Sequence, residues 1–168
     1  MALFQKLVRG TKAFVKEIST PESFVSGKGF EDHVDMMFPK NEWKLIKKTH
    51  DYQSNIERFE DKSKEPDFLF QHIRSKRFVN IECKFRSRPF KDKIEWCKYY
   101  QFKRYKEIDN KYRNVYIILG FGGTATNPRE IFRIPMSEIK YTALYPNSIR
   151  KYKVRNNHRF KLVFGKLK

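Results

Sequence analysis

Two carboxylates and a lysine lie in the middle of the chain at spacings that suit chemistry on a phosphate. Asp67 begins one predicted strand, and Glu82 and Lys84 lie two residues apart on the next. If residues 74 and 75 form a two-residue turn, Asp67 lies opposite Glu82, and a slip of the turn by one residue toward Lys76 places it opposite Lys84. Side chains alternate along a strand, so all three share one face in either register. Directly opposed residues have Cβ atoms about 5 Å apart, so Asp67 and Glu82 can aim at one point.

Two ionised carboxylates this close repel each other unless a cation neutralises them. Mg²⁺ prefers oxygen ligands and retains several waters. It can polarise a phosphoryl oxygen and lower the pKa of a bound water. Lys84 can position that water or stabilise charge on the phosphate. The three residues are therefore sufficient for metal-assisted hydrolysis of a phosphodiester. The alternative is a cross-strand cluster of salt bridges on a solvated face, the commoner arrangement on an arbitrary hairpin.

The surrounding segments predict the elements that must hold these residues. Alternating apolar residues indicate strands over residues 67–73 and 78–85, preceded by a strand over residues 43–48. A helix is expected over residues 91–111, because apolar residues recur there at spacings of three and four. That stripe consists of Ile94, Cys97, Gln101, Tyr105 and Ile108. The apolar run of residues 114–120 predicts a buried strand.

The flanking segments complete the predicted order. Residues 22–38 predict a helix that carries one apolar stripe, and residues 3–18 predict an amphipathic lead helix. The polar residues 51–66 are expected to form a loop. Residues 130–139 predict a strand, with Pro135 marking an edge or a bend. The tail is expected to add a short helix or a strand such as residues 160–164. A hairpin followed by a helical crossover into a buried strand implies an α/β fold with a mixed sheet covered by helices.

This arrangement resembles the PD-(D/E)xK motif of the restriction-endonuclease-like nuclease superfamily. Pro66-Asp67 is followed, after a strand-length gap, by Glu82-Cys83-Lys84. Glu31 on the preceding helix resembles the upstream acidic position often seen in that superfamily. Gln101 and Tyr105 resemble the Q-x-x-x-Y signature of the helix after the catalytic strand. The resemblance spans residues 27–120, and the motifs occur in the family's order.

The resemblance implies a restriction-endonuclease-like core. Its sheet would be mixed and four- to five-stranded, flanked by helices in the order α-β-β-β-α-β. Asp67, Glu82 and the backbone carbonyl of Cys83 would hold Mg²⁺, for which Mn²⁺ can substitute. Glu31 would be an outer or second-metal carboxylate. It can equally be an ordinary exposed helix acid.

The resemblance also implies roles around the metal. Lys84 would be the catalytic lysine. Gln101 would lie beside the active site and contact the phosphate or a water. Tyr105, one helical turn later, would support Gln101 or bind the nucleic-acid backbone. A tyrosine on this stripe is more often a core residue.

The charge of the chain indicates a polyanionic partner. There are 37 Lys and Arg residues against 19 Asp and Glu, a net charge of +18 over 168 residues. Basic and aromatic residues together suit phosphate contacts and base stacking. The residues expected to contact nucleic acid are Lys84, Arg86, Arg88, Tyr105, Arg150, Lys151, Lys153 and Arg155. The superfamily hydrolyses DNA more often than RNA, so the resemblance favours DNA.

Other classes of protein are excluded or disfavoured by simple counts. No apolar run approaches the ~18–20 residues of a membrane span. Charged residues divide residues 1–20 into apolar stretches that are too short for a signal peptide. Two cysteines make neither a disulfide framework nor a zinc motif, so a reducing cytoplasm is expected. We expect one domain over residues 1–168: an N-terminal helix in residues 1–20, a nuclease-like core in residues 22–123 and a basic C-terminal extension in residues 124–168.

The sequence therefore predicts a Mg²⁺-dependent, endonuclease-like phosphodiesterase that acts on DNA, without a membrane partner. Specificity would come from loops, from the basic tail, or from symmetry in a homodimer. The rival hypothesis is a basic nucleic-acid-binding module of the same fold that lacks catalysis. A third hypothesis is a membrane-surface protein that binds through residues 3–18.

Overall fold

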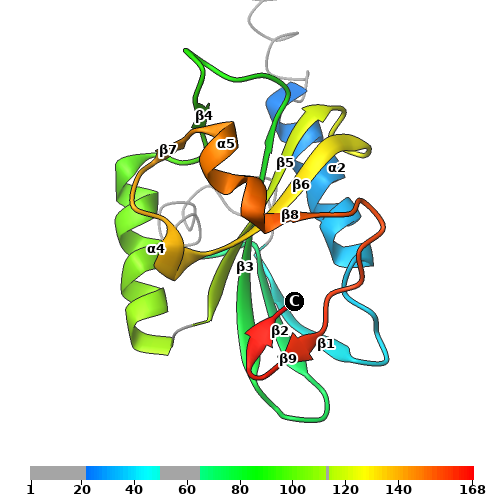
Figure 1. Ribbon diagram of the computed structural model, residues 1–168. Coiled ribbons are helices and arrows are strands. Elements are labelled where there is room, and N and C mark those ends of the chain that lie inside the picture. The colour runs from blue at the N-terminus through cyan, green and yellow to red at the C-terminus, as the bar shows by residue number, and fades with distance from the viewer. Residues whose placement is uncertain (1–21, 50–64, 113) are drawn as a thin grey trace, which may run out of the picture.

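A computed structural model describes residues 22–49, 65–112 and 114–168 (Figure 1). Within these residues, six strands form one sheet in the order β1-β2-β3-β5-β6-β8. The strands are β1 (Trp43–Lys48), β2 (Phe68–His72), β3 (Phe78–Arg86), β5 (Val115–Gly123), β6 (Pro128–Pro135) and β8 (Lys153–Val154). The sheet is thus wider than the four to five strands expected. The predicted helix over residues 3–18 and most of the predicted loop over residues 51–66 lie outside the described residues.

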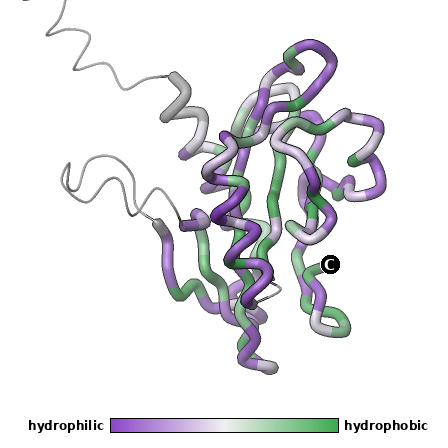
Figure 2. Tube along the Cα trace, turned by 90° about the vertical axis from the view of Figure 1, so that its left-hand side faces the viewer, coloured by the Kyte–Doolittle hydropathy of each residue, from purple (hydrophilic) through white to green (hydrophobic). Residues whose placement is uncertain are grey.

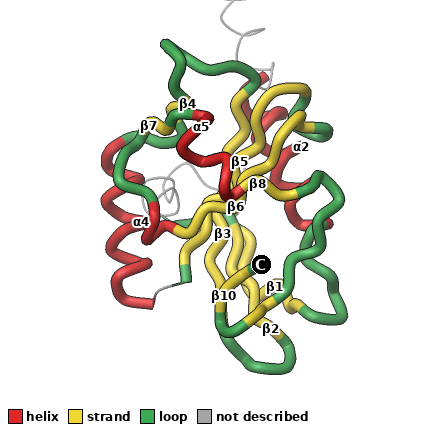
Figure 3. The backbone as a smooth tube through the Cα atoms, viewed as in Figure 1, coloured by secondary structure: helices red, strands yellow, loops and turns green. Residues whose placement is uncertain are grey.

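The sheet is mixed, as the sequence predicts. β3 and β5 run parallel, whereas the other neighbouring strands run antiparallel. The connection from β3 to β5 carries helix α4 (Tyr99–Tyr112), because parallel neighbours require a long crossover. Helix α2 (Glu22–Met36) and α4 lie on opposite sides of the sheet, as Figure 3 shows. The α/β class is therefore confirmed.

The sheet separates two apolar cores. On β5, Tyr116 and Ile118 face the core beneath α2, whereas Ile117 and Leu119 face the core beneath α4. This is the alternation expected of a strand covered on both faces. The apolar residues expected on a helix over residues 22–38 are buried in the first core. Phe30 and Val34 lie on α2, whereas Met37 and Phe38 follow its end at Met36. Figure 2 shows hydrophobic stretches within the sheet and hydrophilic ones along most loops.

Gly120 allows α2 to approach the sheet closely. A Cβ atom added to Gly120 would lie 2.5 Å from the Phe30 ring, closer than any packed carbon atoms. The aromatic ring therefore occupies the space that a side chain on β5 would take. This contact sets the distance between α2 and the centre of the sheet.

The β2–β3 hairpin adopts the first of the two predicted registers. Phe68 pairs with Ile81, so Asp67, one residue before β2, lies opposite Glu82 in the same register. Phe68 is 1% exposed and faces the α2 core. Both predicted registers place Phe68 on this face, because their pairings differ by two residues, so burial fixes the face of the strand and not the choice between the two registers.

The turn of this hairpin is longer than expected. The His72 N–H donates to the Arg77 carbonyl, and the Lys76 N–H donates to the His72 carbonyl, both at 2.8 Å. Lys76 has a φ of 59°. The loop therefore spans residues 73–76 instead of the two residues 74 and 75. The register is unaffected because the strand pairs on either side keep their partners.

Helix α4 begins at Tyr99 and not near residue 91. Phe90 and Lys93 pair across a tight turn formed by Lys91 and Asp92, whose φ values are 46° and 58°. Two left-handed residues suit a two-residue hairpin turn and are incompatible with a helix. The chain then forms β4 (Ile94–Glu95), which pairs with β7 (Ala143–Leu144). Helical spacing from Ile94 was therefore misleading.

β6 ends at Pro135, where the sequence predicted an edge or a bend. A 3₁₀ helix, η2 (Met136–Glu138), follows directly, so residues 136–139 are not part of the strand. β6 is not an edge strand, because β8 pairs with it through residues 131 and 132. Pro135 therefore marks a bend.

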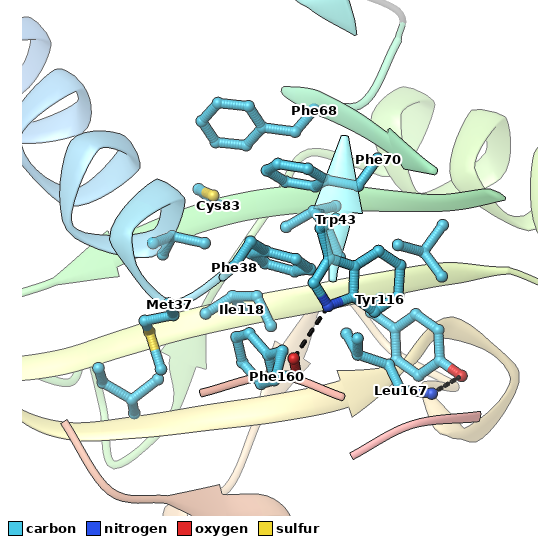
Figure 4. Close-up of a cluster of buried hydrophobic side chains, with 14 of the residues drawn as sticks. Met37, Phe38, Trp43, Phe68, Phe70, Cys83, Tyr116, Ile118, Phe160 and Leu167 are labelled. Atoms are coloured by element: carbon cyan, nitrogen blue, oxygen red, sulfur yellow. Dashed lines mark hydrogen bonds between the residues drawn. The ribbon is translucent and has the colours of Figure 1, made fainter. Parts of the chain in front are cut away.

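The C-terminal tail packs into the core and is not merely an appended extension. Phe160 and Leu167 are fully buried. The Trp43 indole N–H donates to the Phe160 carbonyl at 2.9 Å, and the Leu167 N–H donates to the Tyr116 hydroxyl at 3.1 Å (Figure 4). These contacts join the tail to β1 and β5. Residues 124–168 therefore contribute to the same core as residues 22–123.

The tail contains the expected short helix, α5 (Pro146–Ile149), followed by a 3₁₀ turn, η3 (Arg150–Tyr152). The predicted strand over residues 160–164 is replaced by a hairpin of β9 (Leu162–Val163) and β10 (Lys166–Leu167). Phe164 and Gly165 form its turn with φ values of 48° and 73°. Phe164 is therefore exposed at a tip and does not pack in the core.

Candidate active site

Asp67 is held by backbone contacts on both sides. The Thr49 hydroxyl donates to the Pro66 carbonyl, and the Thr49 N–H donates to the Asp67 carbonyl, each at 2.8 Å. Oδ2 of Asp67 accepts a hydrogen bond of 2.7 Å from the Cys83 N–H. The Asp67 side chain is half-buried. Its carboxylate is therefore fixed against β3.

Glu82 and Lys84 lie together on the face of β3 that points toward α4. They pair with Ile117 and Leu119 of β5, both of which face the α4 core. Glu82 is 1% exposed, and its Oε1 lies 2.5 Å from Nζ of Lys84. Oε2 of Glu82 is buried and has no hydrogen-bond partner within the described residues. Cys83, between them, points into the α2 core.

The negative charges of this cluster act on one another. Burial raises the pKa of Asp67 well above the ordinary carboxyl value, and the nearby charges of Glu82 and Glu31 raise it further. The charge of Lys84 and the hydrogen bond from Cys83 only partly oppose that rise. Three carboxylates therefore share one region of the molecule, and one lysine does not offset them.

Lys84 remains an ammonium ion in this environment. Burial alone would lower its pKa, but the charges of Glu82 and Asp67 outweigh burial and raise it. A lysine in this state donates hydrogen bonds and carries positive charge, but it does not accept a proton near neutral pH. Lys84 is therefore suited to positioning a water or stabilising an anionic oxygen.

Tyr105 is a buried support for Glu82 and not a nucleic-acid contact. Its side chain is 1% exposed, so the expected contact with a nucleic-acid backbone is excluded by burial. Burial raises the pKa of Tyr105, and the charge of Glu82 and a hydrogen bond to Glu82 add to the rise. The ring also stacks on Trp96, with centroids 6.2 Å apart. Tyr105 therefore holds Glu82 from the α4 side.

Glu31 lies at the margin of the cluster, on α2. Its charge raises the pKa of both Asp67 and Cys83. Its Oε2 lies 3.8 Å from Nζ of Lys48, which is also 3.1 Å from Oδ1 of Asp32. Glu31 is therefore electrostatically part of the site, and its role as an outer metal ligand stays a prediction.

Gln101 caps the start of α4. Its Oε1 accepts a hydrogen bond of 3.1 Å from the Lys98 N–H, one of the N–H groups that the first turn of a helix leaves unsatisfied. The side chain is half-buried. Capping accounts for a polar residue on an otherwise apolar stripe, and a contact of Gln101 with a phosphate or water stays a prediction.

The donor set of the cluster fits a hard divalent cation. Asp67 and Glu82 supply carboxylate oxygens, and the buried Oε2 of Glu82 is an acceptor without a donor among the described residues. A cation between the two carboxylates would relieve the repulsion that raises the pKa of Asp67. Among the described residues, no group of three or more His, Cys, Asp and Glu side chains is placed to hold a metal ion. A cation here would therefore have two carboxylates from the protein and water at its other positions.

Arg86 is a structural residue in spite of its predicted contact with nucleic acid. Its Nε donates to the Glu95 carbonyl at 2.6 Å and its Nη2 to the Trp96 carbonyl at 3.0 Å. Its Nη1 donates to the Phe85 carbonyl at 2.8 Å. Burial lowers the pKa of Arg86. The guanidinium is therefore used to hold β4 against the end of β3.

The other predicted nucleic-acid contacts lie on the surface. Arg88, Arg150 and Arg155 are exposed. Lys153 and Lys151 are exposed as well, but each has an acidic neighbour. Lys153 Nζ lies 2.6 Å from Glu130, and Lys151 Nζ lies 3.9 Å from Glu138. These surface pairs are weak and do not prevent either lysine from binding a phosphate.

Three residues near the site were not predicted from the sequence. Thr49 anchors Pro66 and Asp67, Trp96 stacks on Tyr105, and the thiol of Cys97 is influenced by the charges of Lys84 and Glu82. The burial of Trp96 could have been predicted, because Ile94 and Trp96 are two residues apart, as inward-facing residues of a strand are. Thr49 carried no such signal, since its partners are backbone groups far along the chain.

A groove of about 760 Å³ lies beside the site. It is bordered by Glu65 and Pro66 and lined by apolar residues such as Leu69, Phe78 and Ile108. None of Asp67, Glu82 and Lys84 lines it. The groove and the Asp67–Glu82–Lys84 cluster are therefore separate features.

Comparison with protein-family models, with curated proteins and with solved structures gives no match to this chain. Among the helices that the structure describes, none is long and apolar enough to cross a membrane.

Proposed function

We propose that this chain is a metal-dependent nuclease that hydrolyses phosphodiester bonds in DNA. The observation that carries the proposal is the meeting of Asp67 and Glu82 across the β2–β3 hairpin, with Lys84 2.5 Å from Glu82. Two carboxylates that repel each other, beside a lysine that stays charged, are an arrangement with a cost to folding. A bound cation would neutralise the two carboxylates, and a bound phosphate would neutralise the lysine. Binding of both would therefore offset that cost.

Asp67 and Glu82 would hold the Mg²⁺ ion, with the Cys83 carbonyl and Glu31 as the further ligands that the resemblance implies. When bound, the ion supplies charge neutralisation of the phosphate and a more acidic water. The protein fixes both carboxylates beforehand. Asp67 is held by the Cys83 N–H, and Glu82 is held from the α4 side by Tyr105.

Lys84 would donate hydrogen bonds to a non-bridging oxygen of the phosphate or to the attacking water. Its pKa is raised, so it carries its charge throughout and does not serve as the base. In the resting state it pairs with Glu82. Substrate would therefore draw Lys84 from Glu82 toward the phosphate, which leaves Glu82 to the cation.

The positive charge of the chain supports nucleic acid as the substrate. A net charge of +18 gives long-range attraction to a polyanion and contacts to several phosphates. Exposed cations near the site and on the tail are available for this role, namely Arg88, Arg150, Lys151, Lys153 and Arg155. DNA is preferred over RNA on the resemblance alone.

The second candidate is a nucleic-acid-binding module without catalysis. The observation that favours it is the direct pair of Glu82 and Lys84, which neutralises both charges without a metal ion. This module would bind nucleic acid with a steep salt dependence and without any requirement for a divalent cation.

Cleavage assays distinguish the two candidates. Purified protein is incubated with supercoiled, linear, single-stranded and branched DNA in Mg²⁺, in Mn²⁺ and in EDTA. We expect metal-dependent cleavage that is abolished in Asp67→Asn, Glu82→Gln and Lys84→Ala. Glu107→Gln is the matched control, because Glu107 pairs with Arg104 on the exposed surface of α4. A wild-type protein that binds but leaves every substrate intact in both metals would establish the binding module.

A further inference from the structure

Five exposed aromatic side chains gather beside the candidate site. Phe90, Tyr99, Tyr100, Tyr141 and Tyr145 are each more than half exposed. Large aromatic side chains are rarely exposed together on a protein surface, so a local group of them indicates an interaction site. We call these five residues, together with Lys93, the aromatic–basic patch.

Strand pairing brings the members of the patch together from two distant segments. β4 pairs with β7, with Ile94 opposite Leu144. The same register places Lys93 opposite Tyr145, and Nζ of Lys93 lies 5.1 Å from the centre of the Tyr145 ring. Figure 1 shows β4, β7 and α5 gathered over the start of α4, where Tyr99 and Tyr100 lie.

The patch is anchored to the candidate site through Trp96. The Trp96 N–H donates to the Thr142 carbonyl at 3.0 Å, and its indole N–H donates to the Tyr141 carbonyl at 2.9 Å. The Trp96 ring stacks on Tyr105, which supports Glu82. Arg86 fixes the same segment through the Glu95 and Trp96 carbonyls. The two segments that carry the patch are therefore joined to each other at Trp96 and, through Tyr105, to the support of Glu82.

The charge around the rings is mainly positive. Arg88, Lys91, Lys93, Lys98 and Lys140 are exposed on the same two segments, and the acidic residues there are Asp92 and Glu95. Exposed rings stack on unpaired bases, and lysines contact the phosphates between them. The bases of a duplex are already stacked on each other and do not offer their faces to a protein.

We infer that the aromatic–basic patch binds single-stranded nucleic acid and delivers it to the Asp67–Glu82–Lys84 site. This inference deepens the proposed function and rests on it for the identity of the ligand as substrate. The preferred substrate is therefore a single strand, or a duplex with an unpaired flap or end. Four of the five rings are tyrosines. Their hydroxyls form hydrogen bonds and therefore suit a hydrated nucleic acid better than the apolar interior of a membrane.

The test measures binding separately from cleavage. Fluorescence anisotropy in EDTA compares a labelled 20-nucleotide oligothymidine with a duplex of equal length. We expect Tyr99→Ala with Tyr145→Ala to weaken single-strand binding by about 10- to 100-fold, the range for the loss of base stacking. Binding to the duplex is expected to change by less than about threefold. Tyr145→Phe keeps the ring and is expected to keep the affinity.

Tyr112→Ala and Lys111→Ala are the matched controls. Tyr112 is also exposed, and Nζ of Lys111 lies 5.0 Å from its ring centre, but this pair lies at the far end of α4. Equal losses in the patch and control variants would overturn the inference, as would equal losses for single strand and duplex. Binding of the wild type to anionic vesicles, lost in the same double variant, would reassign the patch to a membrane surface.

The two proposals fail in different ways. If Tyr99→Ala with Tyr145→Ala binds oligothymidine as the wild type does while Mg²⁺-dependent cleavage persists, the inference is wrong and the nuclease stands. If oligothymidine binding depends on the patch but no metal supports cleavage, the patch stands as a binding surface and the nuclease is wrong.

Discussion

The Asp67 carboxylate accepts a hydrogen bond of 2.7 Å from the backbone nitrogen of Cys83, the residue between Glu82 and Lys84. This bond ties the start of β2 to the centre of β3. It also holds one negative charge beside another, because Glu82 lies opposite Asp67 in the hairpin register. The two carboxylates therefore repel each other while Asp67 is ionised, and protonation of Asp67 removes this repulsion.

Removal of the Asp67 charge is expected to stabilise the protein while abolishing its metal response. Asp67→Asn retains an oxygen for the Cys83 N–H and removes the repulsion with Glu82 and Glu31. We expect the free energy of unfolding at neutral pH without metal to rise, because the folded state disfavours the Asp67 charge through burial and through the nearby charges of Glu82 and Glu31. Thermal melts with and without Mg²⁺ provide the measurement. A destabilised variant would show that the Asp67 charge contributes favourably to the fold.

The same repulsion predicts how metal-free stability depends on pH. The pKa of Asp67 is raised in the folded protein, so between the ordinary carboxyl value and the raised value the folded state holds a proton that the unfolded state has lost. Stability contributed by Asp67 therefore falls as pH rises through that window. Urea titrations at several pH values in EDTA are expected to show this fall in the wild type and a flatter profile in Asp67→Asn. Identical profiles would exclude a raised pKa at Asp67.

Tyr105→Phe separates support of Glu82 from packing. The variant keeps the ring against Trp96 but removes the hydroxyl that interacts with the buried Glu82 carboxylate. We expect a loss of about 1–2 kcal/mol of stability, the cost of a lost donor to a buried charged acceptor, and a reduced cleavage rate. Tyr112→Phe, on the exposed end of α4, is the control and is expected to match the wild type. A wild-type rate in Tyr105→Phe would remove Tyr105 from the machinery of the site.

The hairpin and the shared face of Asp67, Glu82 and Lys84 were predictable, because alternation acts locally, but the sequence left two registers open. Phe68 and Phe70 are buried on one face of β2 in either register, and the strand pairing places Asp67 opposite Glu82. The start of α4 was not predictable from spacing, since Ile94 fits a helix with Cys97 and a strand with Trp96. The tight turn at Lys91 and Asp92 places Ile94 in a strand. The positive φ values of this turn could not be predicted from a lysine and an aspartate.

Residue roles were less predictable than residue positions. The motif correctly places Tyr105 on the inward face of α4, but spacing cannot tell whether its hydroxyl faces nucleic acid or Glu82. Gln101 illustrates the same limit, because one amide can cap a helix or contact a phosphate. Thr49 acts only through backbone groups that folding brings near.

Gly120 is expected to tolerate no side chain while Phe30 is present. In Gly120→Ala the new Cβ would lie 2.5 Å from the Phe30 ring, so α2 must shift or the ring must leave its place. We expect a loss of about 1–3 kcal/mol, the usual cost of overpacking a core. Chemical denaturation of Gly120→Ala, Phe30→Leu and the double variant gives the coupling energy. Additive effects of the two substitutions would contradict a direct steric contact.

Arg86 and Arg88 lie two residues apart, yet substitution is expected to affect them in different ways. Arg86 donates to the carbonyls of Phe85, Glu95 and Trp96, so Arg86→Ala leaves these acceptors unsatisfied and frees the segment that carries Phe90. We expect a loss of about 1–3 kcal/mol of stability together with weaker binding of single-stranded DNA.

Arg88 is exposed, so Arg88→Ala is expected to leave the melting temperature unchanged. It is also expected to lessen the salt dependence of binding, because one phosphate contact is lost. Thermal melts and binding isotherms at several salt concentrations distinguish the two effects. If Arg86→Ala melts as the wild type does and changes only the salt dependence, the guanidinium contacts nucleic acid and does not brace β4.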